Sequence, residues 1–296
     1  MQTAPTRTAW LLALCLSATL VAQAGTLVRF RTIFGDILVE LFDAEKPATV
    51  SNFLHYAGSG YWTNLFTHRV VPGFVVQAGG YAVSGRNTAG AQFVQVPRFD
   101  PVPNEFDVGP RRSNVQGTLA MAKRDGDPNS ATTDWFFNLA DNSSVLDVEN
   151  GGFTVFGQVI AGRDVLDVFN RFTYSRTFDQ QPTNRLYYLG NPGPFNAFPN
   201  PPSFPVLSKF TSVHEVYTNL VYFEVTILPL HAQPAEAAPG VRWTGIPGIT
   251  NRVEISENPQ GPWRLLTNVI SSGATETVVS PEPSLAPEFF RIRIGD

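Results

Sequence analysis

Residues Phe66–Gly80 read FTHRVVPGFVVQAGG and place a cation, an aromatic ring and an amide close together in an otherwise apolar run. Valine pairs flank the central Pro72-Gly73, a pattern that predicts a strand, a tight turn and a second strand. A turn at this point folds Arg69 back near Phe74 and Gln77. Taken alone, the run describes a hairpin with an exposed arginine, because most arginines lie at the surface.

Length and composition limit the class of protein. The chain has 296 residues, which is enough for one large domain or two of ordinary size. Its apolar content of 43% supports a sizeable core. The formal net charge is −4 at pH 7 and the basic residues form no block, so we expect no nucleic-acid partner. Frequent glycine and proline, 24 of each, favour turns and loops over long helices.

The first 24 residues have the features of an export signal. Arg7 supplies positive charge, Trp10–Val21 is an apolar run too short for a typical mature transmembrane helix, and Ala22-Gln23-Ala24 is a small-x-small cleavage site. Cleavage there removes Cys15, the only cysteine, and leaves no thiol chemistry. A lipoprotein is the weaker alternative, because Leu14 is not small. We predict an exported protein, periplasmic or extracellular, without a membrane span in its mature chain.

Two elements are expected before the central stretch. Segments Thr26–Phe34 and Ile37–Phe42 are rich in β-branched and aromatic residues and flank Gly35-Asp36, a hairpin turn signal. Pro47 suits the first turn of a helix that ends near Gly58. Its apolar residues recur at helical spacing: Val50, Phe53, Leu54 and Ala57. We therefore predict a hairpin followed by an amphipathic helix.

The chain beyond the stretch alternates short elements with loops. Tyr81–Asn114 is rich in glycine, proline and asparagine and predicts mostly loop. Gly117–Ala122 and Trp135–Leu139 predict strands separated by a polar loop, and Asp164–Phe172 predicts a second helix. Thr173–Ser208 is long and rich in proline, which is typical of an irregular insertion.

The last third of the chain predicts a separate module. Leu220–Ile227 is a strong strand pattern, and the Ala/Pro-rich residues His231–Pro239 predict a linker. Several short strand patterns between turns then predict a small β-module: Val241–Gly245, Arg252–Ser256, Trp263–Thr267, Glu276–Val279 and Phe289–Ile294.

These motifs resemble the cyclophilin family of peptidyl-prolyl isomerases. The central stretch matches the family signature Phe-His-Arg-Val-x-Pro-Gly-Phe-x-x-Gln-x-Gly, except that Thr67 stands where the family has Phe. The resemblance covers Thr26–Leu228 through further family patterns, which here are Pro47–Phe53, Asn104-Glu105, Gly117–Ala122, Val145-Leu146-Asp147 and Phe153–Val159.

The resemblance implies a mainly β fold: a closed antiparallel β-barrel capped by two helices, followed by a small β-sandwich-like module. It places the isomerase domain at residues 25–230, with the insertion at about 173–208, the linker at 231–239 and the β-module at 240–296. It also implies an enzyme that rotates X-Pro bonds of proline-containing polypeptides, assists the folding of exported proteins and uses no cofactor or metal.

By the same resemblance, the catalytic residues are Arg69, Phe74, Gln77 and Phe136. Rotating an X-Pro bond needs no covalent step, so the enzyme needs a donor that bonds the prolyl nitrogen in the twisted transition state. Arginine suits this role because it stays charged. The resemblance also implies a set of substrate-binding residues: His68, Val75, Ala122, Leu146, Val145 and Phe153.

One departure from the family and one rival function stay open. Asp134 stands where the family has Gln, and it could pair with Arg69 or Lys123, or weaken the hold on peptide. The rival function is a proline-peptide binding module with little turnover. In that case the pocket or the C-terminal module would tether a partner.

A calcium site is a further alternative. Residues Asp125–Asn129 resemble the start of a calcium-binding loop. The sixth position is Ser130 rather than Gly, and the twelfth is Phe136 rather than Glu. A solvated turn is therefore the favoured interpretation.

Overall fold

The computed structural model describes residues 25–175, 187–189, 205–208, 213–228, 233–234, 240–244, 250–258, 261–272, 275–279 and 289–294. The predicted export signal lies outside these residues, as do much of the predicted insertion and most of the predicted linker. The chain divides into two compact units. We call Gly25–Leu230 the N-terminal unit and His231–Ile294 the C-terminal unit.

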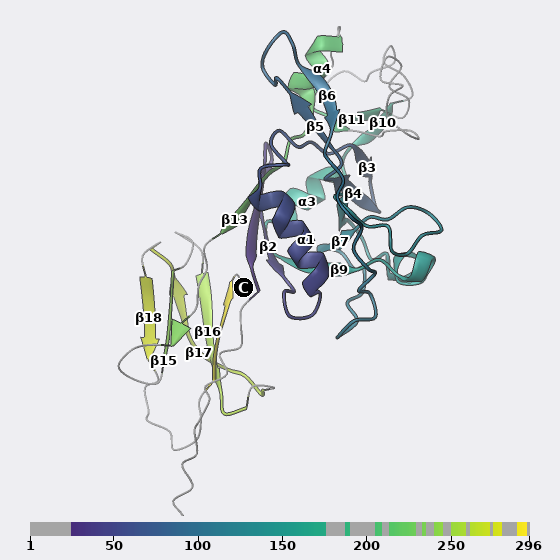
Figure 1. The fold of residues 1–296 in the computed structure, drawn as a ribbon. Coiled ribbons are helices and arrows are strands. Elements are labelled where there is room, and N and C mark those ends of the chain that lie inside the picture. Colours follow the sequence, from purple (N-terminus) through teal and green to yellow (C-terminus); the bar gives the residue numbers. More distant parts are fainter. Residues whose placement is uncertain are drawn as a thin grey trace, which may run out of the picture. The chain divides into compact units, whose positions relative to one another are not determined.

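An eight-stranded antiparallel sheet forms the frame of the N-terminal unit (Figure 1). Its strands in spatial order are β13 (Glu224–Leu228), β1 (Leu27–Thr32), β2 (Gly35–Leu41), β9 (Val155–Ala161), β7 (Thr118–Met121), β8 (Trp135–Asn138), β4 (Val75–Ala78) and β3 (Arg69–Val71).

Backbone hydrogen bonds join the two edges of this sheet. The amide of Thr67 donates to the carbonyl oxygen of Val221 (3.0 Å), and the amide of Phe223 donates to that of Leu65 (2.9 Å). These residues lie in the short segments, of up to four residues, that lead into the edge strands β3 and β13. The sheet therefore closes into a barrel, as the resemblance implied.

Aromatic side chains fill the inside of the barrel. Phe30 packs edge-on against Trp135 and Phe137, with ring centroids 5.1 and 5.0 Å away, and all three are fully buried. The alternation of strands puts every second residue on this inner face, so Val70 and Val76 join the same core. The intervening residues of β3, β4 and β8 are left for the outer face.

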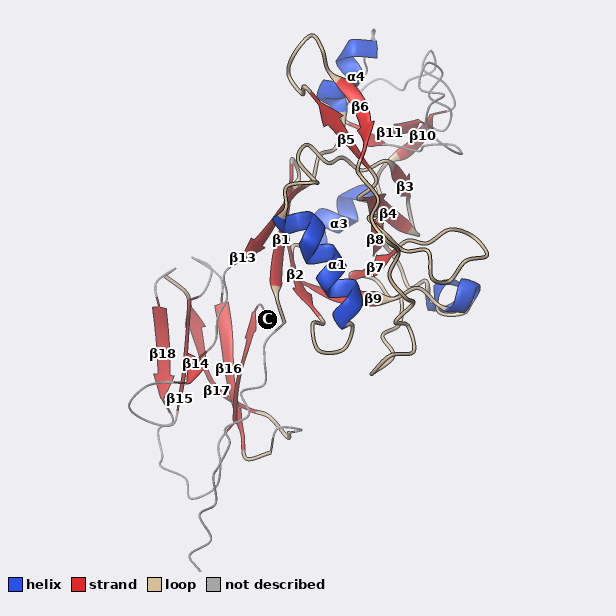
Figure 2. Ribbon diagram, viewed as in Figure 1, coloured by secondary structure: helices blue, strands red, loops and turns tan. Residues whose placement is uncertain are grey.

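Two helices pack on the sheet, and both were predicted (Figure 2). Helix α1 (Pro47–Gly58) buries Val50, Phe53 and Tyr56, and helix α3 (Arg163–Phe169) buries Val165, Leu166 and Phe169. Three short helices were not predicted: α2 (Ser143–Leu146), a 3-10 turn at Glu149–Gly151, and α4 (Val213–Asn219).

The N-terminus of α1 is held by a buried ion. Lys46 is fully buried, and its ammonium donates to the carbonyl oxygens of Glu105 (2.8 Å), Phe106 (3.3 Å) and Val108 (2.5 Å). The Glu105 carboxylate accepts from the amides of Ala48 (3.1 Å) and Thr49 (2.7 Å) in the first turn of the helix. A carboxylate at this place satisfies free amides and suits the helix dipole.

The predicted position of the first hairpin turn was wrong, and the segment predicted as mostly loop after Gly80 also contains two short strands. The first hairpin turns at residues 33–34, two residues before the predicted Gly35-Asp36, since Thr32 pairs with Gly35. The Thr32 hydroxyl holds this turn by accepting from the Phe34 amide (3.0 Å) and donating to the Gly35 carbonyl oxygen (3.0 Å). The predicted loop after Gly80 contains a hairpin, β5 (Tyr81–Ser84) and β6 (Gln92–Gln95).

The predicted insertion is not wholly irregular. Its described parts form a three-stranded sheet of β10 (Thr173–Ser175), β11 (Tyr187–Leu189) and β12 (Pro205–Val206). The strand predicted at Leu220–Ile227 begins later, as β13, because Leu220 and Tyr222 make isolated bridges to Val206 and Phe66 instead.

The described residues of the C-terminal unit form two three-stranded sheets. One sheet has the order β14 (Gln233–Pro234), β15 (Gly240–Thr244), β18 (Thr275–Val279), and the other has β17 (Arg264–Ile270), β16 (Thr250–Ser256), β19 (Phe289–Ile294). All five predicted strand regions are present, whereas β14 lies inside the predicted linker. No helix in the described residues is apolar over a length that would cross a membrane.

Candidate functional site

A single row of residues crosses four neighbouring strands on the outer face of the barrel. Arg69 on β3 pairs with Gln77 on β4, Gln77 pairs with Phe136 on β8, and Phe136 pairs with Ala120 on β7. Directly opposed residues of antiparallel strands point to the same face. The predicted cation, amide and aromatic ring therefore lie side by side, although Phe136 is far from the central stretch in sequence.

The row borders a group of apolar side chains that is separate from the barrel core, which we call the outer apolar cluster. Its buried members are Val75, Ala120, Phe136, Leu146 and Val155, and its half-buried members are Phe42, Phe74, Ala122 and Phe153. The rings of Phe136 and Phe153 meet edge-on with centroids 5.9 Å apart. Six of the residues predicted for catalysis or substrate binding belong to this cluster.

The membership of the cluster differs from the set of predicted site residues at a few positions. Val145 is 40% exposed and does not belong to the cluster, whereas its neighbour Leu146 does. Sequence reasoning missed Ala120, Val155 and Phe42. The strand register could have pointed to Ala120 and Val155, which pair with each other beside Phe136, but a single sequence does not reveal that register.

Arg69 is the cation at the edge of the cluster. Its guanidinium carbon lies 5.9 Å from the centroid of the Phe74 ring, and burial lowers the pKa of Arg69 from its ordinary value. Arginine nevertheless stays charged in proteins. Among the described residues no carboxylate forms a salt bridge with it. Its N–H groups are therefore free to donate to a bound molecule.

The turn that carries Phe74 is well defined. Gly73 has a φ of +73°, which a glycine adopts without strain, and the amide of Phe74 donates to the carbonyl oxygen of Val71 (2.9 Å). The amide of Gly73 donates to Oδ1 of Asn170 (2.8 Å) at the end of α3. At the start of β3, the Thr67 hydroxyl donates to the Gln77 carbonyl oxygen (2.9 Å), a contact that the family's Phe could not make.

A chain of asparagine side chains links the backbone of Phe74 to that of Phe153, two half-buried members of the cluster. The Asn142 amide donates to the carbonyl oxygen of Phe74 (2.8 Å) and to Oδ1 of Asn138 (2.7 Å). The Asn138 amide donates to Oδ1 of Asn114 (3.2 Å), whose own amide donates to the carbonyl oxygen of Phe153 (3.0 Å). Buried, satisfied networks of this kind hold their members rigidly. The sequence analysis did not identify this network.

Asp134 pairs with neither of the partners considered from the sequence. Its carboxylate lies 3.4 Å from Nη2 of Arg98 and 3.5 Å from Nε2 of His68. His68 itself is buried and its ring meets that of Tyr81 at 5.0 Å. Burial lowers the pKa of His68 although Asp134 opposes that shift. His68 is therefore an interior neutral imidazole at neutral pH.

Lys123 binds backbone oxygens instead of a carboxylate. Its ammonium donates to the carbonyl oxygens of Asn150 (2.8 Å) and Gly152 (2.6 Å) and lies 4.7 Å from the centroid of the Phe153 ring. Burial lowers the pKa of Lys123 to about 8. This cation therefore supports Phe153 from the side of the loop that follows α2.

The loop with calcium-like spacing folds as a closed turn. Oδ1 of Asp127 accepts from the amide of Asn129 (3.2 Å), and its Oδ2 accepts from Nη2 of Arg124 (3.1 Å). The described part of the chain contains no group of three or more side chains arranged to hold a metal ion.

The site combines an apolar cluster with a free guanidinium and a side-chain amide. The cluster offers a surface for a small apolar ring, and Arg69 and Gln77 offer hydrogen bonds beside it. Such a site can bind and polarise a substrate without forming a covalent bond to it.

Comparison with known proteins identifies the family that the sequence motifs resemble. The family model described as cyclophilin type peptidyl-prolyl cis-trans isomerase/CLD matches residues 27–187. Peptidyl-prolyl cis-trans isomerase B of Escherichia coli (strain K12) is 37% identical over 145 residues, covering 48% of this chain and 82% of that protein. The peptidyl-prolyl cis-trans isomerase of Acinetobacter baylyi is 37% identical over 147 residues, covering 49% of this chain and 72% of that protein.

A solved structure is also similar. The crystal structure of a Cryptosporidium parvum cyclophilin type peptidyl-prolyl cis-trans isomerase matches with 25% identity and a TM-score of 0.39, covering 54% of this chain and 92% of that chain.

Proposed function

The chain belongs to the cyclophilin-type peptidyl-prolyl cis-trans isomerases and has their activity, and we propose that Arg69 is its catalytic donor and that exported proteins are its substrates. The activity follows from the family.

The reaction sets a physical requirement on the site. Rotation about a peptide bond breaks amide resonance, which costs ~18–20 kcal/mol, and uncatalysed X-Pro exchange takes tens of seconds or more. In the twisted transition state the prolyl nitrogen becomes pyramidal and gains a lone pair. A donor that bonds this lone pair interacts more strongly with the transition state than with either planar isomer, and only such a difference accelerates the reaction.

Arg69 meets this requirement. Its guanidinium is half-buried at the edge of the outer apolar cluster, and no carboxylate in the described chain neutralises it. Hydrogen bonds from a cation are strengthened where water is partly excluded. We assign Gln77, its neighbour across the strand pair, to holding the peptide backbone beside it.

The outer apolar cluster supplies binding, and Arg69 supplies acceleration. Burying the three ring methylenes of proline against Phe136, Leu146 and Phe74 contributes about 2 kcal/mol, at ~0.8 kcal/mol per methylene. The ring is present in both isomers and in the transition state, so this binding lowers KM without raising kcat. Loss of the ring pocket and loss of Arg69 should therefore have different kinetic signatures.

The observation that carries the assignment is the row Arg69–Gln77–Phe136 across β3, β4 and β8. Exchange NMR on a short Ala-Pro peptide tests it. The wild type should accelerate exchange at an enzyme concentration that is a small fraction of the peptide concentration. The Phe136→Ala variant should have a strongly raised KM. Peptide binding by the wild type without any acceleration would overturn the assignment.

The proposal of exported substrates rests on the first 24 residues, which carry a positive charge, an apolar run and a small-x-small site. The expected mature chain begins near Gly25. Expression of the full-length gene product in a bacterium, followed by fractionation and N-terminal sequencing, tests this. An uncleaved chain retained in the cytoplasm would contradict it.

A folding role is tested with a substrate protein. The mature enzyme should accelerate the proline-limited refolding phase of a secreted model protein, and the Arg69→Ala variant should not. An equal effect of both proteins on that phase would contradict a role that depends on isomerisation.

A further inference from the structure

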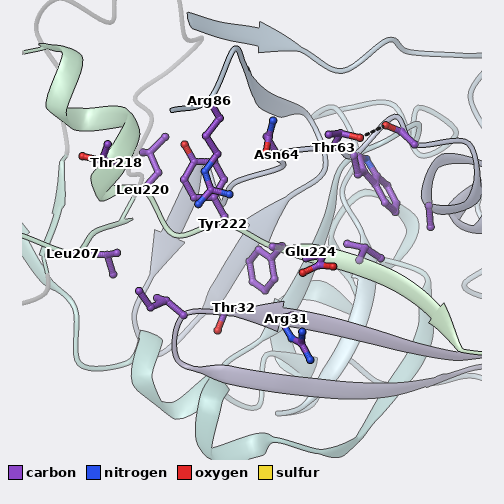
Figure 3. Close-up of a pocket in the computed structure, with 16 residues that line it drawn as sticks. Arg31, Thr32, Thr63, Asn64, Arg86, Leu207, Thr218, Leu220, Tyr222 and Glu224 are labelled. Atoms are coloured by element: carbon purple, nitrogen blue, oxygen red, sulfur yellow. Dashed lines mark hydrogen bonds between the residues drawn. The ribbon is translucent and has the colours of Figure 1, made fainter. Parts of the chain in front are cut away.

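A cavity of about 650 Å³ lies in the N-terminal unit, and none of the residues assigned to the isomerase site lines it (Figure 3). One wall comes from the barrel and the segment after α1: Arg31–Ile33, Trp62–Asn64 and Phe223–Val225. The other wall comes from the β5–β6 hairpin and the residues around α4: Arg86, Leu207, Thr218, Leu220 and Tyr222. Cavities of this size hold drug-sized molecules or short peptide segments.

The second wall is rigid because it has its own core. A small cluster of buried residues joins the β5–β6 hairpin to β12 and α4: Phe66, Tyr81, Val83, Val206, Val216 and Leu220. The Leu207 amide donates to the carbonyl oxygen of Asn219 (2.9 Å), and Val206 forms a bridge with Leu220. The cavity is therefore a formed feature of the fold rather than a gap between loose loops.

A prepositioned cation, Arg86, lines the cavity. The guanidinium carbon of Arg86 lies 3.6 Å from the centroid of the Tyr222 ring, and Figure 3 shows the two side chains stacked. The Tyr222 hydroxyl donates to the carbonyl oxygen of Tyr217 (2.5 Å), which fixes the ring. Stacking of this kind orients a guanidinium and leaves its N–H edge free. Within the described chain, Arg86 makes no hydrogen bond or salt bridge.

The groups around Arg86 differ in kind on its two sides. Leu207 and Leu220 form an aliphatic side, and Asn64 and Glu224 stand on the opposite side (Figure 3). The carboxylate of Glu224 and the amide of Asn64 make no hydrogen bond to another described residue. Arg31 adds little free charge, since its guanidinium binds both carboxylate oxygens of Asp36 (3.0 and 3.2 Å).

We propose that this cavity is a second binding site, which takes an extended polypeptide segment that carries an acidic side chain beside aliphatic ones and needs no proline. The acidic side chain pairs with Arg86, and the aliphatic side chains pack on Leu207 and Leu220. The side-chain amide of Asn64 can donate to a backbone C=O of the peptide, and the carboxylate of Glu224 can accept from a backbone N–H.

A segment of polypeptide fits better than a small acid. A small acid would use Arg86 and leave the groups on the opposite side of the cavity unpaired, whereas a peptide presents polar groups along its whole length. The proposal also gives the site a use that rests on the isomerase activity. A substrate chain held here has a raised effective concentration at the isomerase site of the same unit.

Fluorescence anisotropy with a labelled, proline-free peptide tests the site on the full chain. The probe is Ala-Leu-Glu-Leu-Ala with both ends blocked, and its counterpart has Gln in place of Glu. The Glu peptide should bind the wild type saturably, and Arg86→Gln should weaken binding about ten- to hundredfold, the usual effect of losing a charged hydrogen bond. The Gln peptide should bind weakly to both proteins.

Three control measurements separate the possible outcomes. Arg111 is also an exposed arginine near an aromatic ring, that of Phe106, but it is already paired with Asp107. The Arg111→Gln variant should therefore leave binding unchanged. Arg69→Ala should also leave binding unchanged, which separates this site from the isomerase site. Arg86→Gln should keep wild-type activity on a short Ala-Pro peptide, which shows that the variant folds.

Four results would overturn the proposal. The first is the absence of saturable binding below about 1 mM of the Glu peptide. The second is equal binding by the wild type and Arg86→Gln. The third is loss of binding in Arg69→Ala, which would place the peptide in the isomerase site. The fourth is displacement of the peptide by an equal concentration of N-acetylglutamate, which would make this a site for small acids.

Discussion

Replacing Lys46 by Met should destabilise the N-terminal unit more than the loss of most surface charges would. The ammonium of Lys46 is fully buried and donates to three backbone carbonyl oxygens. The side chain of Met is similar in length but cannot donate. The substitution therefore leaves the carbonyl acceptors in place and removes their partner.

The magnitude can be worked out from the acceptors. The carbonyl oxygen of Glu105 keeps one bond, from the amide of Val108 (3.1 Å), and Val108 itself is partly exposed, so water can reach its carbonyl group. The main loss falls on the buried carbonyl group of Phe106, and a smaller one on Glu105, which keeps one of its two bonds. An unsatisfied buried group costs about 1–3 kcal/mol, so we expect a loss of about 3 kcal/mol in the free energy of unfolding.

Urea unfolding followed by tryptophan fluorescence measures this loss, together with Tm. For a unit of this size, each kcal/mol lowers Tm by about 2–4 °C, so the variant should melt about 9 °C below the wild type. The matched control is Lys123→Met, which removes an ammonium from two carbonyl oxygens at a half-exposed position. Water can replace that ammonium, and the loss should stay below about 1.5 kcal/mol.

Two results would refute this reasoning. A loss of less than about 1 kcal/mol for Lys46→Met would show that the carbonyl groups find other partners. Equal losses for Lys46→Met and Lys123→Met would show that burial is not what makes the ammonium matter.

Three further predictions concern the active-site region. Burial lowers the pKa of His68 below its ordinary value of 6.5, so on acidification the unfolded chain binds a proton that the folded chain does not. Stability should therefore fall as the pH drops below about 6.5, which the urea midpoints at pH 7.5 and 5.5 measure. The same difference between the two midpoints in His68→Gln as in the wild type would contradict this. Lys123 should titrate near pH 8 in an NMR titration of its side chain, and a midpoint above 10 would contradict burial as the cause. Phe136→Leu removes the ring that meets Phe153 and should lower kcat/KM at least about tenfold, because KM rises. A loss confined to kcat would argue against a pure binding role for Phe136.

Local patterns predicted most of the elements that carry the site. The alternation in the stretch around Pro72-Gly73 predicted two strands and a turn, and these are β3, β4 and the turn that presents Phe74. The helical spacing after Pro47 predicted α1, because the same residues that repeat in the sequence face the core. Such patterns depend on neighbours in the chain, so a single sequence contains them.

Contacts between distant segments could not be predicted in this way. The asparagine chain from Phe74 to Phe153 depends on Asn142, which is 68 residues from Phe74 in sequence. The partner of Asp134 is Arg98, which lies in a segment predicted as loop. Both depend on how separate strands align, and no local pattern specifies that alignment.

The shifted first turn has a different cause. Gly35-Asp36 is a good turn signal, but the Thr32 hydroxyl satisfies the backbone of a turn two residues earlier. Side-chain bonds of this kind compete with the glycine preference, and their strengths are too similar to rank from sequence.

The most direct test of the central claim is the exchange rate of a short Ala-Pro peptide in the presence of wild type, Arg69→Ala and Arg98→Ala. Losing a single transition-state donor costs about 10²–10³ in rate, so Arg69→Ala should lose that factor in kcat/KM while its peptide affinity changes little. Arg98→Ala, which removes the exposed partner of Asp134, should stay within about threefold of wild type. An Arg69→Ala enzyme that keeps more than about a third of wild-type kcat/KM would contradict the claim that this guanidinium stabilises the twisted peptide bond.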